Sequence, residues 1–190
     1  MSTINRKTTE SNINVSLNIY GSRKISIDTG IGFFDHMLTL LAFWGKWDLV
    51  LSCKGDLHVD THHTIEDTGL ALGQAFYSEW RESIGIERIS YAFCPLDEAL
   101  SRVVVDICNR PFFTFDAIFN TEKVGEFDTE MTSHFFRSFS QEARITLHVA
   151  SLYGDNAHHI IETMFKGLGL SLFRGLKKID NDVSSTKGML

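Results

Sequence analysis

Hydrophobic residues alternate with polar ones along some stretches of the chain, and along others they recur every three or four positions. In residues 12–20 every second residue is aliphatic, which predicts a strand with one buried face. In residues 32–44 the large apolar residues follow helical spacing. The same two periods predict the other elements: strands before Glu10 and near 24–27, 47–53, 88–93, 98–106, 112–115 and 144–150, and helices at 62–84, 129–142 and 156–177.

These elements form one order that occurs twice: three strands, a helix, a strand and a helix. The two copies meet near residue 87. We therefore predict an α+β fold, a two-layer sandwich that arose by internal duplication of a βββαβα unit, with half-repeats at 1–87 and 88–179. Gly21 and Ser22 are expected to form the hairpin between the second and third strands. Composition alone predicts that the polar tail, 180–190, is a frayed terminus.

A five-residue motif also occurs twice, with a single histidine upstream of each copy. His36 precedes the first motif by 26 residues, and His134 precedes the second by 24. Six of the eight histidines therefore fall into two matching sets. The two motifs are His62-His63-Thr64-Ile65-Glu66 and His158-His159-Ile160-Ile161-Glu162.

The motif has the character of a metal site. At about 100° per residue, the first histidine and the glutamate four positions later share one face of a helix. Imidazole and carboxylate ligands suit zinc, manganese or iron, and two sets of three histidines and one glutamate would leave open positions for substrate. Neighbouring histidines diverge, so each could serve a different ion. One copy alone would be read as capping or surface histidines, but two copies with upstream partners predict two catalytic metal sites. Asp60 or Thr61, and Asp155 or Asn156, can cap the two long helices.

Composition narrows the class of protein. The chain has 190 residues, of which 43% are hydrophobic, and this is enough to bury a good core. Only two residues are proline. The net charge of −6 gives no footprint for nucleic acid, and no stretch reaches the ~20 apolar residues of a membrane span. Residues 1–14 lack an apolar signal core, and the three cysteines are scattered. We therefore expect a cytoplasmic protein with its cysteines buried as small hydrophobes.

Six segments, taken in order, resemble the imidazoleglycerol-phosphate dehydratase family of histidine biosynthesis along essentially the whole chain. They are 30–38 (GIGFFDHML), 55–69 (GDLHVDTHHTIEDTG), 95–100 (PLDEAL), 135–139 (FFRSF), 156–166 (NAHHIIETMFK) and 185–188 (STKG). Three positions depart from the family pattern: Thr61 is often aspartate there, Asn109 is usually glycine, and Ser184 is often proline.

The resemblance implies a hydro-lyase that binds two Mn²⁺ ions per subunit and assembles from 24 subunits, with metal sites at subunit contacts. The implied metal ligands are His36, His62, His63, Glu66, His134, His158, His159 and Glu162, the residues that the duplication also selects. The implied substrate-binding residues are Glu10, Arg88, Arg110, Lys166, Ser185 and Lys187, which would give the tail a role in phosphate binding.

The expected reaction is dehydration of D-erythro-imidazole glycerol phosphate to imidazole acetol phosphate. The proton to be removed is barely acidic, so the imidazole ring must assist; bound by manganese as an imidazolate, it could expel the hydroxyl group. Glu10 is our candidate for the proton transfer. The alternatives are a dinuclear metallohydrolase and a metal-binding protein without activity. The separate roles of Asp97, Glu98 and Asp106 are not readable from the sequence. Two further interpretations are that Phe135, Phe136 and Phe139 form a core stripe and that His148 is a core histidine.

Overall fold

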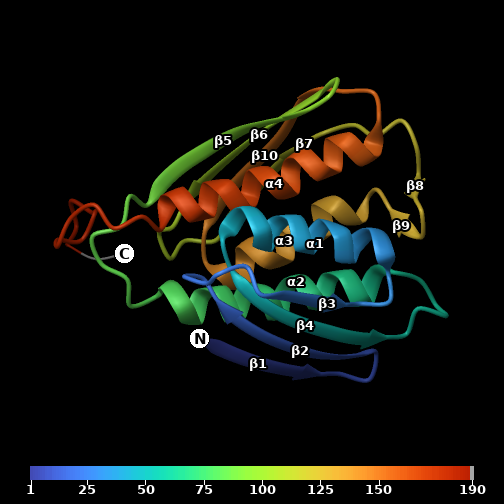
Figure 1. The fold of residues 1–190 in the computed structure, drawn as a ribbon, viewed down its shortest axis with the longest axis horizontal. Helices are drawn as coiled ribbons and strands as arrows, with labels where there is room; N and C mark the ends of the chain where they lie inside the picture. The colour runs from blue at the N-terminus through green and yellow to red at the C-terminus, as the bar shows by residue number, and fades with distance from the viewer. Residues whose placement is uncertain (189–190) are drawn as a thin grey trace.

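The structure is a computed structural model that describes residues 1–188. Each half carries its own four-stranded sheet, one above and one below the helices in Figure 1. The first sheet has the order β1-β2-β4-β3 and the second β5-β6-β10-β7. The elements of the first half are β1 (Ser2–Lys7), β2 (Ser11–Asn18), β3 (Ile25–Asp28), α1 (Gly32–Gly45), β4 (Asp48–Gly55) and α2 (His62–Trp80).

The second half repeats this order, with one addition. Its elements are β5 (Ile89–Leu96), β6 (Ala99–Asp106), β7 (Phe112–Asp116), α3 (Met131–Ala143), β10 (Thr146–Tyr153) and α4 (Ala157–Gly175). The addition is a two-stranded ribbon, β8 (Lys123–Val124) and β9 (Phe127–Asp128), which the periodicity did not predict because each strand has only two residues. The predicted α+β class and the repeated order of elements are confirmed.

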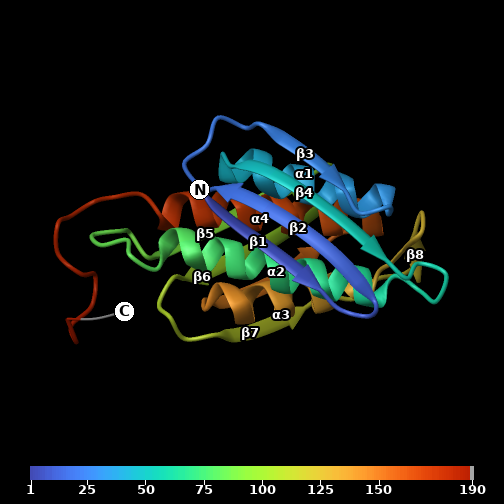
Figure 2. The same ribbon diagram turned by 90° about the horizontal axis from the view of Figure 1, so that it is seen from below.

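Each half is a two-layer unit of one sheet and two helices, and the halves meet helix layer to helix layer. Across this contact α1 packs against α4, and α2 packs against α3 (Figures 1 and 2). Equivalent glycines allow the close approach: a Cβ on Gly73 of α2 would lie 2.6 Å from the Phe139 carbonyl oxygen, and one on Gly169 of α4 would lie 2.4 Å from that of Leu41. The two halves therefore share one hydrophobic core.

The predicted hairpin at Gly21 and Ser22 is wrong. β4 lies between β2 and β3, and β3 pairs with β4 in parallel. Parallel neighbours need a crossover, which α1 provides, so β3 is placed on the far edge of the sheet. The connection at 19–24 is held instead by the Asp48 carboxylate, which accepts the backbone N–H groups of Ser22 (2.7 Å) and Lys24 (2.8 Å).

Burial confirms most of the predicted core. The three phenylalanines of α3 that form the expected stripe, Phe135, Phe136 and Phe139, are fully buried, and all three cysteines are free and buried. His148 is the exception: it is exposed, because its neighbours in β10, Leu147 and Val149, occupy the inward-facing positions of an alternating strand. Among residues 1–188, no helix is long and apolar enough to cross a membrane.

Candidate metal and phosphate site

The first turns of the two long helices place the histidine pairs. At α2, Asp60 Oδ1 accepts the backbone N–H of His62 at 2.7 Å, and at α4, Asn156 Oδ1 accepts that of His158 at 2.9 Å. Of the proposed caps, these two make the bonds. Thr61 instead donates its hydroxyl to Asp128 Oδ2 at 2.9 Å, so it ties the start of α2 to the ribbon of the other half.

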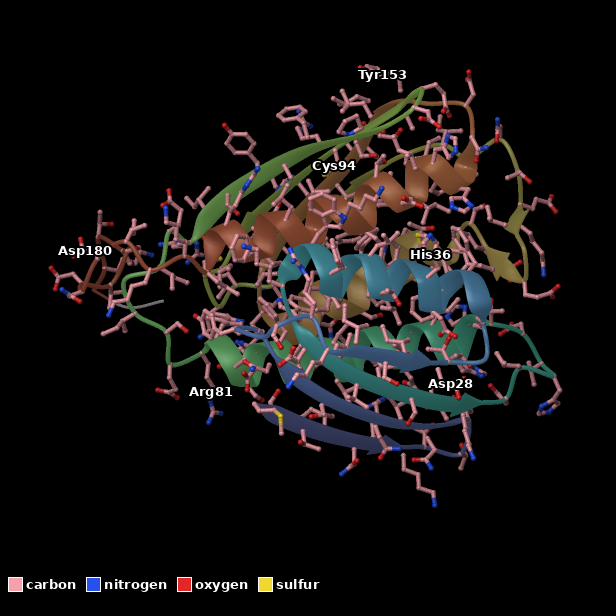
Figure 3. The ribbon with its side chains drawn as sticks, in the orientation of Figure 1. Asp28, His36, Arg81, Cys94, Tyr153 and Asp180 are labelled. Carbon is pink, nitrogen blue, oxygen red and sulfur yellow. The ribbon has the colours of Figure 1, made fainter. Side chains whose placement is uncertain are left out.

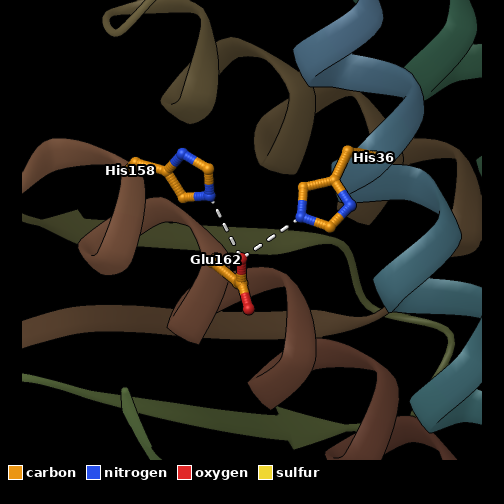
Figure 4. Close-up of side chains that lie close together, drawn as sticks. All are labelled: His36, His158 and Glu162. Atoms are coloured by element: carbon orange, nitrogen blue, oxygen red, sulfur yellow. Dashed lines mark hydrogen bonds and ion pairs between the residues drawn. The ribbon is translucent and has the colours of Figure 1, made fainter. Parts of the chain in front are cut away.

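Two compact groups of potential ligands form near the starts of these helices. In the His36 cluster (His36, His158, Glu162), Oε2 of Glu162 lies 3.3 Å from Nε2 of His36 and 3.2 Å from Nε2 of His158 (Figure 4). In the His62 cluster (His62, Glu66, His134), Nε2 of His62 lies 2.9 Å from Oε2 of Glu66, and the ring centroids of His62 and His134 are 4.8 Å apart. In each cluster the ligand atoms lie within 4.8 Å of one another.

Each cluster draws its potential ligands from both halves of the chain. The sequence places His36 with His62, and His134 with His158, in matching sets of one repeat each, but it leaves open which residues share an ion. The packing of α1 on α4 brings His36 to Glu162, and Figure 3 shows His36 on α1, between the two sheets. The packing of α2 on α3 brings His134 to His62. The single upstream histidine of each half therefore joins the first histidine and the glutamate of the motif in the other half.

The second histidine of each pair lies outside the clusters and is held by carboxylates. His63 donates from Nδ1 to Asp56 at 3.0 Å, and His159 donates from Nδ1 to Glu98 at 2.7 Å. These hydrogen bonds raise the pKa of both histidines, and the pKa of Glu98 falls to about 2 because it pairs with His159 and accepts the Asn156 N–H. A carboxylate on Nδ1 leaves Nε2 available as a ligand atom.

Asp56 was missed by the sequence reasoning, although it stands within the 55–69 motif. It lies just after β4, seven residues before His63, and a loop contact over that distance has no periodic signal. Glu98 was noticed without a role; its place at the β5–β6 turn, against the start of α4, gives it one.

Glu10 lies at the turn between β1 and β2, close to His63 at the start of α2. Its Oε1 is 3.7 Å from Nε2 of His63, and its side chain is half-exposed. Asp97 occupies the comparable β5–β6 turn, 4.0 Å from Nε2 of His159. Both second histidines thus face a carboxylate from a hairpin tip.

The chemistry of the donors fits a divalent metal. Two imidazoles and one carboxylate converge in each cluster, with no cysteine, which suits an intermediate ion such as manganese, iron or zinc. In the His36 cluster, burial acts to raise the pKa of Glu162, but Lys166 and the two histidines outweigh it and hold that pKa below its ordinary value. The carboxylate is therefore ionised and able to bind a cation.

A second group of cations gathers at the opposite end of α4. Arg88, Arg110 and residues 184–187 line an open pocket. Asp106 fixes Arg88 through two bonds, Nε–Oδ1 at 2.6 Å and Nη2–Oδ2 at 3.0 Å, and raises the pKa of that guanidinium. Arg88 Nη1 also donates to the Ser184 carbonyl oxygen at 2.7 Å, which ties the tail to the pocket at that residue. Residues 189–190 of the predicted tail lie outside the described residues.

The departures from the family pattern have local explanations. Asn109 has φ of 58°, a left-handed conformation that asparagine tolerates better than most residues. Ser184 donates its hydroxyl to the Ile86 carbonyl oxygen at 2.6 Å, which holds the segment that a proline would have stiffened. Lys166 is not part of this pocket; its Nζ lies 2.5 Å from Oε1 of Glu162.

The comparisons with known proteins agree with this arrangement. The family model described as imidazoleglycerol-phosphate dehydratase matches residues 29–172. Curated relatives with that name include those of Clostridioides difficile (49% identical, 98% of this chain, 97% of the relative) and Acetivibrio thermocellus (50%, 98% and 97%).

Two solved structures are also similar. The enzyme of Pyrococcus furiosus superposes with a TM-score of 0.86 at 36% identity, over 98% of this chain and 100% of that one. The enzyme of Staphylococcus aureus superposes with a TM-score of 0.80 at 36% identity, over 94% of this chain and 100% of that one. The resemblance noted in the sequence is confirmed. The chain belongs to the imidazoleglycerol-phosphate dehydratase family, the hydro-lyases that carry out this dehydration in histidine biosynthesis.

Proposed function

We propose that this chain dehydrates imidazole glycerol phosphate to imidazole acetol phosphate with two Mn²⁺ ions per subunit. The observation that carries the proposal is the pair of clusters, each with two imidazoles and one carboxylate within 4.8 Å. His36, His158 and Glu162 would hold one ion, and His62, Glu66 and His134 the other. When bound, the ions would act as Lewis acids on the substrate imidazole and so promote loss of its neighbouring hydroxyl group.

Glu10 is the group we assign to proton transfer. Its Oε1 would accept the proton from the substrate carbon, and its half-exposed position at a hairpin tip leaves room for the substrate to approach. Nε2 of His63 lies 3.7 Å from Glu10 Oε1, and Nδ1 of the same ring is bonded to Asp56, so Glu10 stands beside a histidine that would bind metal. Asp56 and Glu98 orient the two outer histidines for metal binding.

The substrate phosphate would be bound by Arg88, Arg110, Ser185 and Lys187. Two arginines offer the fork of N–H donors that suits a phosphate dianion, and Asp106 presets the orientation of one of them. Lys166, which the resemblance also assigns to phosphate, lies one helical turn from Glu162 and would meet the phosphate from the metal side.

The separation of the two regions supports an active site shared between subunits. Arg88 N–H bonds the carbonyl oxygen of Gly175, at the end of α4, whereas His158 lies at its start. At 1.5 Å per residue, the helix between them spans about 25 Å, far more than one substrate molecule can bridge. A cation pocket from one copy facing the clusters of another would complete the site, as expected for a large homo-oligomer of 24 subunits.

The exposed surface supports assembly as well. The outer face of β5 presents Ile89, Tyr91 and Phe93, which are 60%, 60% and 53% exposed. Such a stripe is unusual for a free surface and suits contact with another copy.

Replacement of Glu10 tests the assignment of proton transfer. Glu10→Gln should lower kcat by about 10²–10⁴-fold and leave manganese content unchanged, because the amide cannot accept the proton. Steady-state kinetics with imidazole glycerol phosphate and elemental analysis measure both. The exposed Glu126→Gln is the matched control. A Glu10→Gln enzyme with full turnover would remove Glu10 from the reaction, and a wild-type chain without dehydratase activity in the presence of Mn²⁺ would refute the function itself.

A further inference from the structure

The two clusters differ at the position one helical turn after their glutamates. Lys166 follows Glu162 by four residues, and its Nζ lies 2.5 Å from Oε1 of that carboxylate. The equivalent position after Glu66 is Leu70. Among residues 1–188, Glu66 forms its ion pair with His62 alone. One of the two duplicated carboxylates therefore carries an ammonium partner, and the other does not.

The two glutamates also differ in exposure to solvent, and the one paired with lysine is the more buried. The side chain of Glu162 is 11% exposed and that of Lys166 is 18% exposed, whereas the side chain of Glu66 is 42% exposed. Charges that are withdrawn from water are screened less, so the Lys166 ammonium acts on the His36 cluster with most of its strength. No comparable cation lies on the Glu66 carboxylate in the described part of the chain.

This asymmetry bears directly on cation binding. An ion in the His36 cluster needs an oxygen of Glu162, and the ammonium both occupies one of those oxygens and repels the incoming charge. An ion in the His62 cluster meets neither obstacle. The donors of the two clusters are otherwise the same, two imidazoles and one carboxylate.

We propose that Lys166 makes the two metal sites unequal, so that the His62 cluster fills first and the His36 cluster holds the second ion more weakly. The inference rests on the proposed function only in requiring that both clusters bind a divalent ion. Lys166 thereby acts as a tuning residue for one metal site of a duplicated pair.

Titration of the metal-free full-length protein with Mn²⁺ alone tests this. Free Mn²⁺ is followed by the electron paramagnetic resonance signal of the aqueous ion. We expect the wild type to show two classes of site that differ in Kd by at least about tenfold. Lys166→Gln should strengthen the weaker class to within about threefold of the stronger one, whereas Lys166→Arg, which keeps the charge, should retain the difference.

The reciprocal variant moves the charge to the other half. Leu70 is only partly buried, and Leu70→Lys places an ammonium one turn after Glu66, so it should weaken the tighter class by about tenfold. His134→Ala should abolish the tighter class and His36→Ala the weaker. Lys178→Gln, at an exposed and distant position, is the control.

Each outcome decides the matter. Two equal classes in the wild type, or a difference that Lys166→Gln leaves unchanged, would overturn the inference while leaving the proposed function intact. A folded wild-type protein that binds no Mn²⁺ would instead refute the proposed function. Circular dichroism and thermal melting check that each variant folds. If Lys166→Gln does not fold, Leu70→Lys still decides, because an unchanged tight site in that variant contradicts the proposed effect.

Discussion

The two halves of the chain carry the same potential ligands but differ in the character of their outer sheet faces. The outward-facing residues of β1, the counterpart of β5, and of its neighbour β2 are all polar: Thr3, Asn5, Lys7, Asn12, Asn14, Ser16 and Asn18. The outward-facing residues of β5 include Ile89, Tyr91 and Phe93. The partner of the second histidine also differs in origin: Asp56 comes from the loop after β4, and Glu98 from the β5–β6 turn. Duplication preserved the chemistry of the helix starts and left the outer faces and supporting loops free to diverge.

The largest expected effect comes from double variants that set the two groupings of ligands against each other. His36→Ala with His158→Ala removes two ligands of one cluster, so the protein should retain one Mn²⁺ per subunit. His36→Ala with His62→Ala damages both clusters and should retain none. Activity should fall by more than about 100-fold in both.

Elemental analysis after metal reloading distinguishes the two double variants. If His36→Ala with His62→Ala kept one ion while His36→Ala with His158→Ala kept none, the ligands would be grouped within halves and the cross-half geometry would be wrong.

A second prediction concerns the carboxylate that orients the cation pocket. Asp106→Asn keeps the shape but removes the charge that fixes Arg88, a charge-assisted pair of about 1.5–3 kcal/mol. We expect KM for the phosphate substrate to rise about tenfold, with kcat changed less than threefold, because the pocket binds and does not react.

Asp116→Asn, at the exposed end of β7, is the matched control. A structural role alone would lower thermal stability without a selective rise in KM, and Asp106→Glu should restore part of the affinity.

The contrast between the two sheet faces predicts which one supports assembly. Tyr91→Lys places a charge in the apolar stripe of β5 and should shift the protein to smaller species in sedimentation velocity, at a cost of about 1.5–3 kcal/mol per buried side chain. Asn14→Lys makes the comparable change on β2 and should leave the assembled mass unaltered. Equal behaviour of the two variants would show that the apolar face of the second sheet plays no special part.

The smallest effect belongs to the connections that precede the third strand of each half. Asp48, at the start of β4, holds the 19–24 connection, and Thr146, at the start of β10, bonds the Arg110 carbonyl oxygen. Hydrogen bonds from the Lys24 and Ser22 amides lower the pKa of Asp48 below its ordinary value of 3.8. The ionised Asp48 carboxylate therefore contributes its full stabilisation above pH 3.8, and this contribution is lost as the pH falls through the lowered pKa.

Asp48→Asn should accordingly lower the Tm by no more than a few degrees at pH 7 and make no difference at a pH below the lowered pKa. Melting curves of both proteins across this range give the result. A Tm difference that persists after protonation would assign the effect to shape rather than charge.

Local pattern predicted the elements, and the duplicated motif predicted which residue types converge in the two clusters, because both depend on residues close together in the chain. The grouping of His36 with Glu162 could not be predicted, since it depends on which helix of the other half α1 contacts. Asp56 and the position of β3 were missed for the same reason: a loop contact and a crossover connection have no period. His148 was misassigned because an isolated histidine in an apolar strand reads as core until the register is known.

The exchange of ligands between halves has a consequence for descent. Neither repeat contains a complete cluster, so an ancestral chain with a single repeat could have gathered these donors only as a two-fold dimer. In such a dimer the two clusters would be identical by symmetry. Two repeats within one chain are free of that identity, so a change such as Lys166 on one side does not require the same change on the other.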